Sequence, residues 1–296
     1  MRPVISFRNI AWLIILGIMT FAGSIGIGAT PDETNTSGIG NDALAAPRAA
    51  VADFNGDGHP DFVVRHAATR LTAIWYLNNN IFLSGAVGPT IRTGWLLKSA
   101  ADFDLDSHPD YALLNPATNE TGVWYLSGTT FIGAAFGPPL PDGWELVETG
   151  DFNGNGFPDY VLSNATTRQT AIWFLTNNIY NSGAFGPTLP TGWNVVGIAD
   201  FDTDGHEDYL LFNSGTHQTA IWYLSGAIFI RGVYGPTITS GWILVGTADF
   251  NNDGHPDYLI YNTVSRQTGI WYLTGNVFVS AAFGPTLPTG WSLVGP

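Results

Sequence analysis

The sequence predicts an all-β protein, a five-bladed β-propeller whose blades are four-stranded antiparallel sheets. Three observations lead to this fold class. A 49-residue repeat runs through the chain after the N-terminal region. The chain contains 36 Gly and 18 Pro, which break helices but suit short strands and tight turns. Short runs of β-branched and aromatic residues alternate with such turns, which is the local pattern of strands.

The repeat is visible in three columns of residues. An aspartate and two tryptophans each recur at intervals of 49, and the repeat fills residues 52–296 as five units without a gap. Radial repetition of small β-units is the sequence signature of a propeller, because one blade cannot bury both of its faces alone. The columns are Asp53, Asp102, Asp151, Asp200 and Asp249; Trp75, Trp124, Trp173, Trp222 and Trp271; and Trp95, Trp144, Trp193, Trp242 and Trp291.

Each unit contains four strand signals. The third of these strands is apolar on both faces, which suits a sheet packed on both sides. In the last complete unit the predicted strands lie within 242–245, 258–261, 268–273 and 277–280.

The phase of the repeat predicts how the ring closes. The chain ends on Trp291-Ser292-Leu293 and resumes in register at Ala52-Asp53-Phe54, and the joined segments resemble 242–250. We therefore expect the C-terminal segment to pair beside the first blade and remove its open edge. Residues 47–51 compete for the same position.

The N-terminal residues predict an export signal. Arg2 and Arg8 precede Ile10–Ala29, a run of twenty residues without charge. We interpret residues 1–29 as a signal peptide or signal anchor, 30–46 as a flexible linker and 47–296 as the propeller. The protein is thus expected to be secreted, at the cell surface or in a periplasm, with membrane contact only through an uncleaved N-terminal segment.

Composition excludes several classes of function. The absence of Cys excludes disulfides, thiolate metal sites and Cys nucleophiles. A net charge of −14 argues against nucleic acid as a partner. We expect no enzyme, because the polar columns repeat whereas an active site needs different groups in different roles. The ionisable residues outside the repeat pattern form no recognisable constellation; they are His66, Lys98, Glu145, Glu148, His217 and Arg231.

A nine-residue acidic loop in every unit predicts a metal site. Positions one, three, five and nine carry oxygen side chains, and the backbone carbonyl of position seven supplies a fifth ligand, which suits the oxygen-rich shell of Ca²⁺. Up to five Ca²⁺ are therefore expected. The ligands are Asp53, Asn55, Asp57, His59 and Asp61; Asp102, Asp104, Asp106, His108 and Asp110; Asp151, Asn153, Asn155, Phe157 and Asp159; Asp200, Asp202, Asp204, His206 and Asp208; and Asp249, Asn251, Asp253, His255 and Asp257.

These loops differ from EF-hands at their ends. The twelfth position is apolar (Val64 in the first unit) where an EF-hand has Glu, and the flanking segments are strands. Position six is Gly for a sharp turn in four loops and Ser107 in the second. The ligand carboxylates number three, four, two, four and three along the chain. The third loop is therefore predicted to bind Ca²⁺ most weakly.

The loops, together with Phe136-Gly137, Phe185-Gly186 and Phe283-Gly284, resemble FG-GAP and VCBS-type repeats, the family that includes the propellers of integrin α-subunits. The resemblance covers residues 52–296 and implies a Ca²⁺-dependent extracellular propeller, often in adhesion or carbohydrate binding. The sequence departs from the family pattern in two ways, which limits how far the properties of the family can be expected here. The Gly-Ala-Pro after the second strand is replaced, for example by Asn115-Pro116-Ala117, and there are five repeats rather than seven blades.

The leading functional hypothesis is a secreted or surface-anchored calcium-binding propeller that acts as a binding or adhesion module for a glycan or protein ligand. The alternative is a multivalent calcium-stabilised lectin with sugar sites between blades, using tryptophan faces.

Of the two tryptophan columns, the one starting at Trp95 is expected to be the more exposed. The imidazole side chains at position seven are expected to point away from the ion. A threonine column either lines repeated polar sites or satisfies a strand edge: Thr72, Thr121, Thr170, Thr219 and Thr268.

Overall fold

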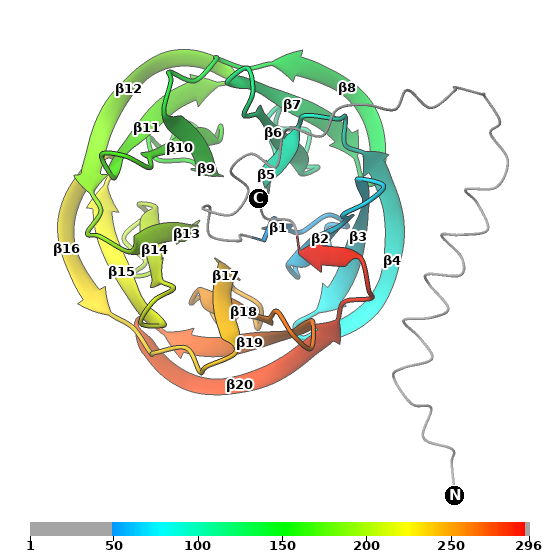
Figure 1. The fold of residues 1–296 in the computed structure, drawn as a ribbon, viewed down its shortest axis with the longest axis vertical. Helices are drawn as coiled ribbons and strands as arrows, with labels where there is room; N and C mark the ends of the chain where they lie inside the picture. The colour runs from blue at the N-terminus through cyan, green and yellow to red at the C-terminus, as the bar shows by residue number, and fades with distance from the viewer. Residues whose placement is uncertain (1–48, 294–296) are drawn as a thin grey trace, which may run out of the picture. The chain divides into compact units, whose positions relative to one another are not determined.

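A computed structural model describes residues 49–293, and these residues form β-strands with no helix among them. The strands make five sheets arranged as blades around an axis (Figure 1). The predicted fold class, an all-β five-bladed propeller, is confirmed. The predicted signal segment 1–29 and linker 30–46 lie outside the described residues. Within 49–293, no helix could cross a membrane.

The blades follow one another along the chain, and each keeps the same strand order. Blade 1 contains β1 (Val51–Ala52), β2 (Asp61–His66), β3 (Leu71–Asn78) and β4 (Ile81–Thr90). Blade 2 contains β5 (Leu96–Ala101), β6 (Asp110–Asn115), β7 (Glu120–Ser127) and β8 (Thr130–Phe136). Blade 3 contains β9 (Trp144–Gly150), β10 (Asp159–Asn164), β11 (Gln169–Thr176) and β12 (Ile179–Thr188). Blade 4 contains β13 (Trp193–Ala199), β14 (Asp208–Asn213), β15 (Gln218–Ser225) and β16 (Ile228–Tyr234). Blade 5 contains β17 (Trp242–Ala248), β18 (Asp257–Asn262), β19 (Gln267–Thr274) and β20 (Val277–Thr286).

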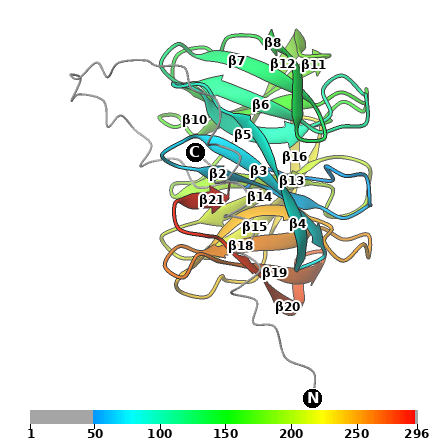
Figure 2. The ribbon, with the colours of Figure 1, turned by 90° about the vertical axis from the view of Figure 1, so that its right-hand side faces the viewer.

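Within a blade, each strand pairs antiparallel with the next. The first strand lies nearest the axis and the fourth forms the outer edge (Figures 1 and 2). In blades 2 to 5 the innermost strand carries a register shift where it pairs with the second strand, as between Leu244 and Gly246. The extra residue of such a bulge increases the local twist of the strand.

The ring closes in blade 1, where two segments share the innermost position. β21 (Trp291–Leu293) pairs with the C-terminal half of β2, with Leu293 opposite Val64, while β1 pairs with the N-terminal half, with Val51 opposite Phe62. The predicted pairing of the C-terminal segment is confirmed. The N-terminal residues of the propeller do not compete with it, because each segment covers its own part of β2. The break between β1 and β21, here called the join, lies opposite the part of β2 where the innermost strands of the other blades have their bulge.

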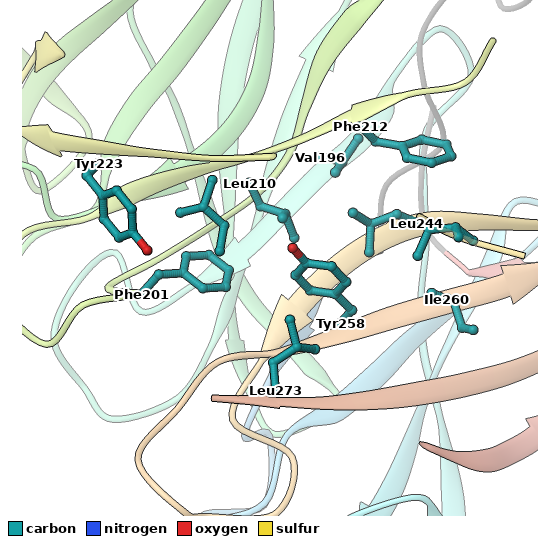
Figure 3. Close-up of a cluster of buried hydrophobic side chains, with 11 residues drawn as sticks. Val196, Phe201, Leu210, Phe212, Tyr223, Leu244, Tyr258, Ile260 and Leu273 are labelled. Atoms are coloured by element: carbon teal, nitrogen blue, oxygen red, sulfur yellow. The ribbon is translucent and has the colours of Figure 1, made fainter. Parts of the chain in front are cut away.

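The core lies between blades. In the cluster between blades 4 and 5, Leu210 and Val196 of blade 4 pack with Leu244, Tyr258 and Ile260 of blade 5 (Figure 3). An edge-to-face aromatic pair crosses every blade junction, joining the Phe at loop position two to an aromatic residue of the next blade. The pairs are Phe54–Tyr111, Phe103–Tyr160, Phe152–Tyr209, Phe201–Tyr258 and Phe250–Phe62, with centroids 5.9 to 6.5 Å apart.

The threonine column is structural. All five side chains are buried, and each Oγ1 donates to the carbonyl of a proline in or next to the outermost strand, at 2.7 or 2.8 Å. The strand-edge alternative is therefore confirmed.

The circumference of the ring is apolar. Among the described residues, the exposed large hydrophobic side chains all lie on the outermost strands β4, β8, β12, β16 and β20, apart from Leu105 and Val264. These five strands carry one charged residue, Arg231.

Candidate metal centre

The predicted ligand loops occupy equivalent places in the five blades. Each loop joins the innermost strand to the second strand, so repetition around the axis places all five loops on one face of the ring. The aspartate at position nine is in every case the first residue of the second strand.

Backbone conformation at two loop positions explains their residue types. Position six has a positive φ in all five loops, about 85° at Gly58 and 72° even at Ser107. Position four is also left-handed, including at Leu105 and Thr203, where a side chain makes this conformation unfavourable. The predicted sharp turn at position six is therefore confirmed, and the loop tolerates a non-glycine residue there.

The aspartate at position one organises the turn through its carboxylate. Asp53 Oδ1 accepts a hydrogen bond from the N–H of Gly56, and its Oδ2 accepts one from Gly58, both at 2.8 Å. The bond to the N–H of position six recurs in the other four loops at 2.7 or 2.8 Å. The carboxylate of position one thus holds the backbone of the turn in the same conformation in all five loops.

The aspartate at position nine is fully buried in every loop. Asp61 Oδ2 accepts from the N–H of Phe54 at 3.0 Å, and Oδ1 accepts from the N–H of Leu77 in β3 at 2.9 Å. The same two bonds recur at Asp110, Asp159, Asp208 and Asp257. A carboxylate oxygen has two lone-pair directions, so each oxygen of Asp61, Asp110, Asp208 and Asp257 retains one for an ion, whereas both oxygens of Asp159 also accept from Asn153.

Burial also changes the acidity of position nine. Desolvation raises the pKa of Asp61, and likewise of Asp110, Asp208 and Asp257, to about 7, against an ordinary value of 3.8. The two backbone N–H donors oppose this rise without cancelling it. For Asp159 the pKa rises to about 6 from the same cause. A nearby cation would favour the ionised form of each group.

Two loops bring three carboxylates together. In the second loop, oxygens of Asp102, Asp104 and Asp106 lie within 4.8 Å of one another. In the fourth loop, the same holds for Asp200, Asp202 and Asp208. These oxygen-only groups fit a hard cation of calcium size.

The other three loops have Asn at position three, and its amide bonds within the loop. Asn55 Nδ2 donates to Asp57 Oδ2, and Asn251 Nδ2 donates to Asp253 Oδ2, each at 2.9 Å. In the third loop, Asn153 Nδ2 donates instead to Asp159, at 3.2 and 3.3 Å. In the third loop the amide of position three is thus bonded to the buried Asp159, and the weakest ion binding in this loop stays a prediction.

At position seven the backbone N–H, rather than the side chain, takes part in the loop. The N–H of His59 donates to Asp57 Oδ1 at 2.9 Å, and the equivalent bond is present in the other four loops. Among residues 49–293, no group of clustered metal-ligand side chains includes a histidine.

Sequence reasoning missed a polar cluster on the innermost strands of blades 2 and 3. Lys98 Nζ pairs with Glu145 Oε1 at 2.6 Å, and the hydroxyl of Ser99 bonds to Glu148 and to Thr149. Lys98 stands where the other repeats have Val, and Glu148 stands where most of them have Gly. These two departures from the repeat were the sequence signal that could have pointed to the cluster.

The tryptophan columns do not differ in exposure as expected. Most members of both columns are half-buried, while Trp75 and Trp291 are buried. A pocket of about 220 Å³ lies on one face of blade 5. Tyr258 lies on the same face, and its hydroxyl bonds to Thr219 of blade 4. It is lined by aromatic and small residues, including Trp242, Trp271, Phe283 and Thr239.

The chain matches the model of a known repeat family. The FG-GAP-like repeat model matches residues 53–113, 151–211 and 200–260, which together make up more than half of the chain. The matched segments contain the acidic loops and the strands on both sides of them. No curated protein sequence matches the chain.

Solved structures with a related arrangement are distant in sequence. A protein of unknown function from Bacteroides caccae is 13% identical over 74% of this chain and 71% of its own, with a TM-score of 0.43. The Tc holotoxin pore of Photorhabdus luminescens is 15% identical over 84% of this chain but 12% of its own, with a TM-score of 0.44. The V. cholerae biofilm matrix protein Bap1 is 15% identical over 80% of this chain and 39% of its own, with a TM-score of 0.31. Likenesses this distant carry no argument about function.

Proposed function

Because the chain belongs to the FG-GAP-like repeat family, we propose that it is a calcium-binding β-propeller that acts as a binding or adhesion module outside the cytoplasm. The observation that carries this proposal is the fivefold loop, with oxygen side chains at positions one, three, five and nine around a buried aspartate. We assign up to five Ca²⁺ to these loops. The third loop is expected to fill last.

The ions would act on the ring through position nine. Asp61 is bonded to the loop at Phe54 and to β3 at Leu77, and the Phe54 ring packs on Tyr111 of the next blade. An ion bound to Asp61 therefore neutralises a buried carboxylate at the point where loop, blade and neighbouring blade meet. Calcium binding is expected to stiffen every blade junction in this way, and a rigid ring presents its surface to a ligand with little loss of conformational entropy.

The first experiment compares unfolding with and without the ion. The melting temperature should rise on adding millimolar Ca²⁺ to chelator-treated protein, with dissociation constants of about 0.1 to 1 mM per loop. Mg²⁺, which prefers rigid octahedral sites, should raise it less. Asp102→Asn removes the negative charge of one ligand and should reduce the effect, whereas Asp142→Asn, outside the loops, is the matched control. Equal melting temperatures with and without Ca²⁺ would contradict the proposal.

A second candidate function, a lectin, is favoured by the pocket on blade 5. The rings of Trp242 and Phe283 stack at 6.0 Å with an interplanar angle of 26°, and Phe283 is 73% exposed. Such a platform suits the apolar face of a neutral sugar. Related pairs are Trp95–Phe136, Trp144–Phe185 and Trp193–Tyr234, while blade 1 has Val87 in place of the aromatic.

A glycan array probed with wild-type protein and with Phe283→Ala, each in Ca²⁺, tests the lectin. Binding that is lost in Phe283→Ala but kept in Val264→Ala, another exposed apolar residue, supports sugar recognition at the pocket. The absence of any glycan signal in Ca²⁺ removes the lectin and leaves a protein ligand for the adhesion module.

The proposed location rests on the sequence of residues 1–29 alone. Mass spectrometry of the N-terminus of protein recovered outside the cell distinguishes a cleaved signal peptide from a retained anchor. We propose neither a catalytic role nor a nucleic-acid partner.

A further inference from the structure

The fourth loop has a cation of its own. Arg231, on the outermost strand β16, donates from Nη2 to Asp202 Oδ2 at 2.8 Å. Asp202 is the position-three ligand of the fourth loop and converges with Asp200 and Asp208. The guanidinium also lies over the ring of Tyr223, with Cζ 3.5 Å from the ring centroid, which fixes its direction. Arg231 is therefore held against a ligand by a residue of the neighbouring strand.

Arg231 interrupts an otherwise uncharged column. The equivalent residues in the other four blades are small: Ser84, Gly133, Ser182 and Ser280. The aromatic partner is more general, because Tyr76, Tyr125 and Tyr272 occupy the position of Tyr223 in three other blades. Among the five blades, only blade 4 carries a charged residue at this position.

The second loop provides a comparison within the same molecule. The second and fourth loops each have four ligand carboxylates, and both have Asp at position three. Among residues 49–293, Asp104 takes part in neither of the two salt bridges. The two loops differ at position three, where a guanidinium offsets one of the four carboxylates of the fourth loop, and at position eight, where the fourth loop has Glu207 and the second has Pro109.

We propose that Arg231 acts as an internal cation of the fourth loop, which lowers the affinity of this loop for Ca²⁺ and keeps it ordered when Ca²⁺ is scarce. This inference rests on the proposed calcium binding. To bind an ion with its full ligand set, the loop must share Asp202 Oδ2 between the ion and Arg231, or release the arginine. When Asp202 is shared, the divalent ion meets a site that is less negative by one charge; when the arginine is released, binding costs the Arg231–Asp202 ion pair.

The size of the effect follows from geometry. Arg231 and Asp202 are partly exposed, with side-chain accessibilities of 51% and 28%, so the pair alone contributes little to folding. A divalent ion bound to Asp202 would nevertheless lie within a few ångströms of the guanidinium, well inside the screening length of physiological salt. We expect the fourth loop to bind Ca²⁺ about tenfold more weakly than the second.

Crystals of the full chain equilibrated with a series of Tb³⁺ or Ca²⁺ concentrations give the occupancy of each loop from the anomalous signal. In the wild type, the second loop should fill at about one tenth of the concentration that fills the fourth. Arg231→Gln should bring the fourth loop close to the second, whereas Arg231→Lys, which keeps the charge, should leave the difference in place.

The reciprocal variant is Gly133→Arg. A side chain fits there, because a Cβ at this position would lie 3.8 Å from the nearest atom, on Tyr125. This variant should lower the affinity of the second loop without changing the others. In ion-free buffer, hydrogen exchange should be slower in the fourth loop than in the second, and Arg231→Gln should remove that protection.

The outcomes separate this inference from the function on which it rests. Loops that fill with ion, with equal affinity in the second and fourth and no response to Arg231→Gln, would overturn the role of Arg231 and leave calcium binding intact. Loops that fill at no concentration would overturn the proposed function and this inference together.

Discussion

A glycine at the end of each outer strand stands where no side chain fits. A Cβ on Gly137 would lie 2.5 Å from Thr121 Oγ1 and 2.8 Å from the hydroxyl of Tyr160 in the next blade. The same threonine contact, at 2.4 or 2.5 Å, limits Gly88, Gly186, Gly235 and Gly284. The Phe-Gly pairs that relate the chain to its family are thus explained by packing between the outer strand, the buried threonine and the neighbouring blade.

Replacing Gly137 by alanine is therefore expected to destabilise the fold. The Cβ must displace a buried hydrogen-bonded threonine, so Gly137→Ala should lower the free energy of unfolding by about 1 to 3 kcal/mol. Gly133→Ala, on the same strand but with room for a Cβ, should change it by less than about 0.5 kcal/mol. Urea unfolding of both variants measures the difference, and equal stabilities would show that the threonine contact is not limiting.

Contacts between side chains on different strands could not be predicted from the sequence. The clustering of the loop aspartates was predictable, because their spacing lies within nine residues of one loop. Arg231 is 29 residues from Asp202, and Lys98 is 47 from Glu145. Both contacts depend on register. The pairing of Tyr223 with Arg231 is set just before a register shift in β15 and β16, and the position of such a shift has no clear signal in the sequence.

At the scale of the loop, the buried aspartate of position nine makes stability depend on pH when no ion is bound. The pKa values of Asp61, Asp110, Asp208 and Asp257 are raised to about 7, so the folded protein holds protons that the unfolded chain releases near pH 4. The contribution of these groups to stability is full below pH 4 and is lost as the pH rises through about 7.

Ion-free protein should therefore become less stable between pH 5 and pH 8. Urea unfolding in metal-free buffer over this range measures the slope. Calcium-saturated protein is the control, and its slope should be opposite, because protons compete with the ion for the same oxygens. A stability of the ion-free protein that rises with pH would show that the position-nine carboxylates are ionised in the fold without a metal.

For the whole molecule, the join in blade 1 should control stability. Truncation after Gly290 removes β21, which exposes the edge of β2 beside Val64 and leaves blade 1 with an incomplete inner strand. We expect the melting temperature to fall by several degrees, in line with a loss of about 2 kcal/mol or more. Ser292→Ala, an exposed position within β21, is the control and should melt like the wild type. An unchanged melting temperature after truncation would mean that β1 alone closes the ring.

The architecture was predictable because its evidence is redundant. Five copies of the same strand pattern, in an unbroken register from Asp53 to Trp291, specify the number of blades and the meeting of the two ends. The repeat does not predict the contacts of residues that differ between copies. Repetition identifies what every blade shares, whereas features such as the Lys98–Glu145 pair arise where a single blade departs from the pattern.

The apolar circumference of the ring affects how many copies of the protein behave in one solution. Because the formal net charge is −14, copies of the ion-free chain are expected to repel one another, which would keep the uncovered outer strands apart. Five bound Ca²⁺ would contribute +10 and leave −4. Calcium would then stiffen each ring and also weaken the electrostatic repulsion between rings. Copies that stay dispersed without Ca²⁺ would associate through their outer strands when Ca²⁺ is abundant.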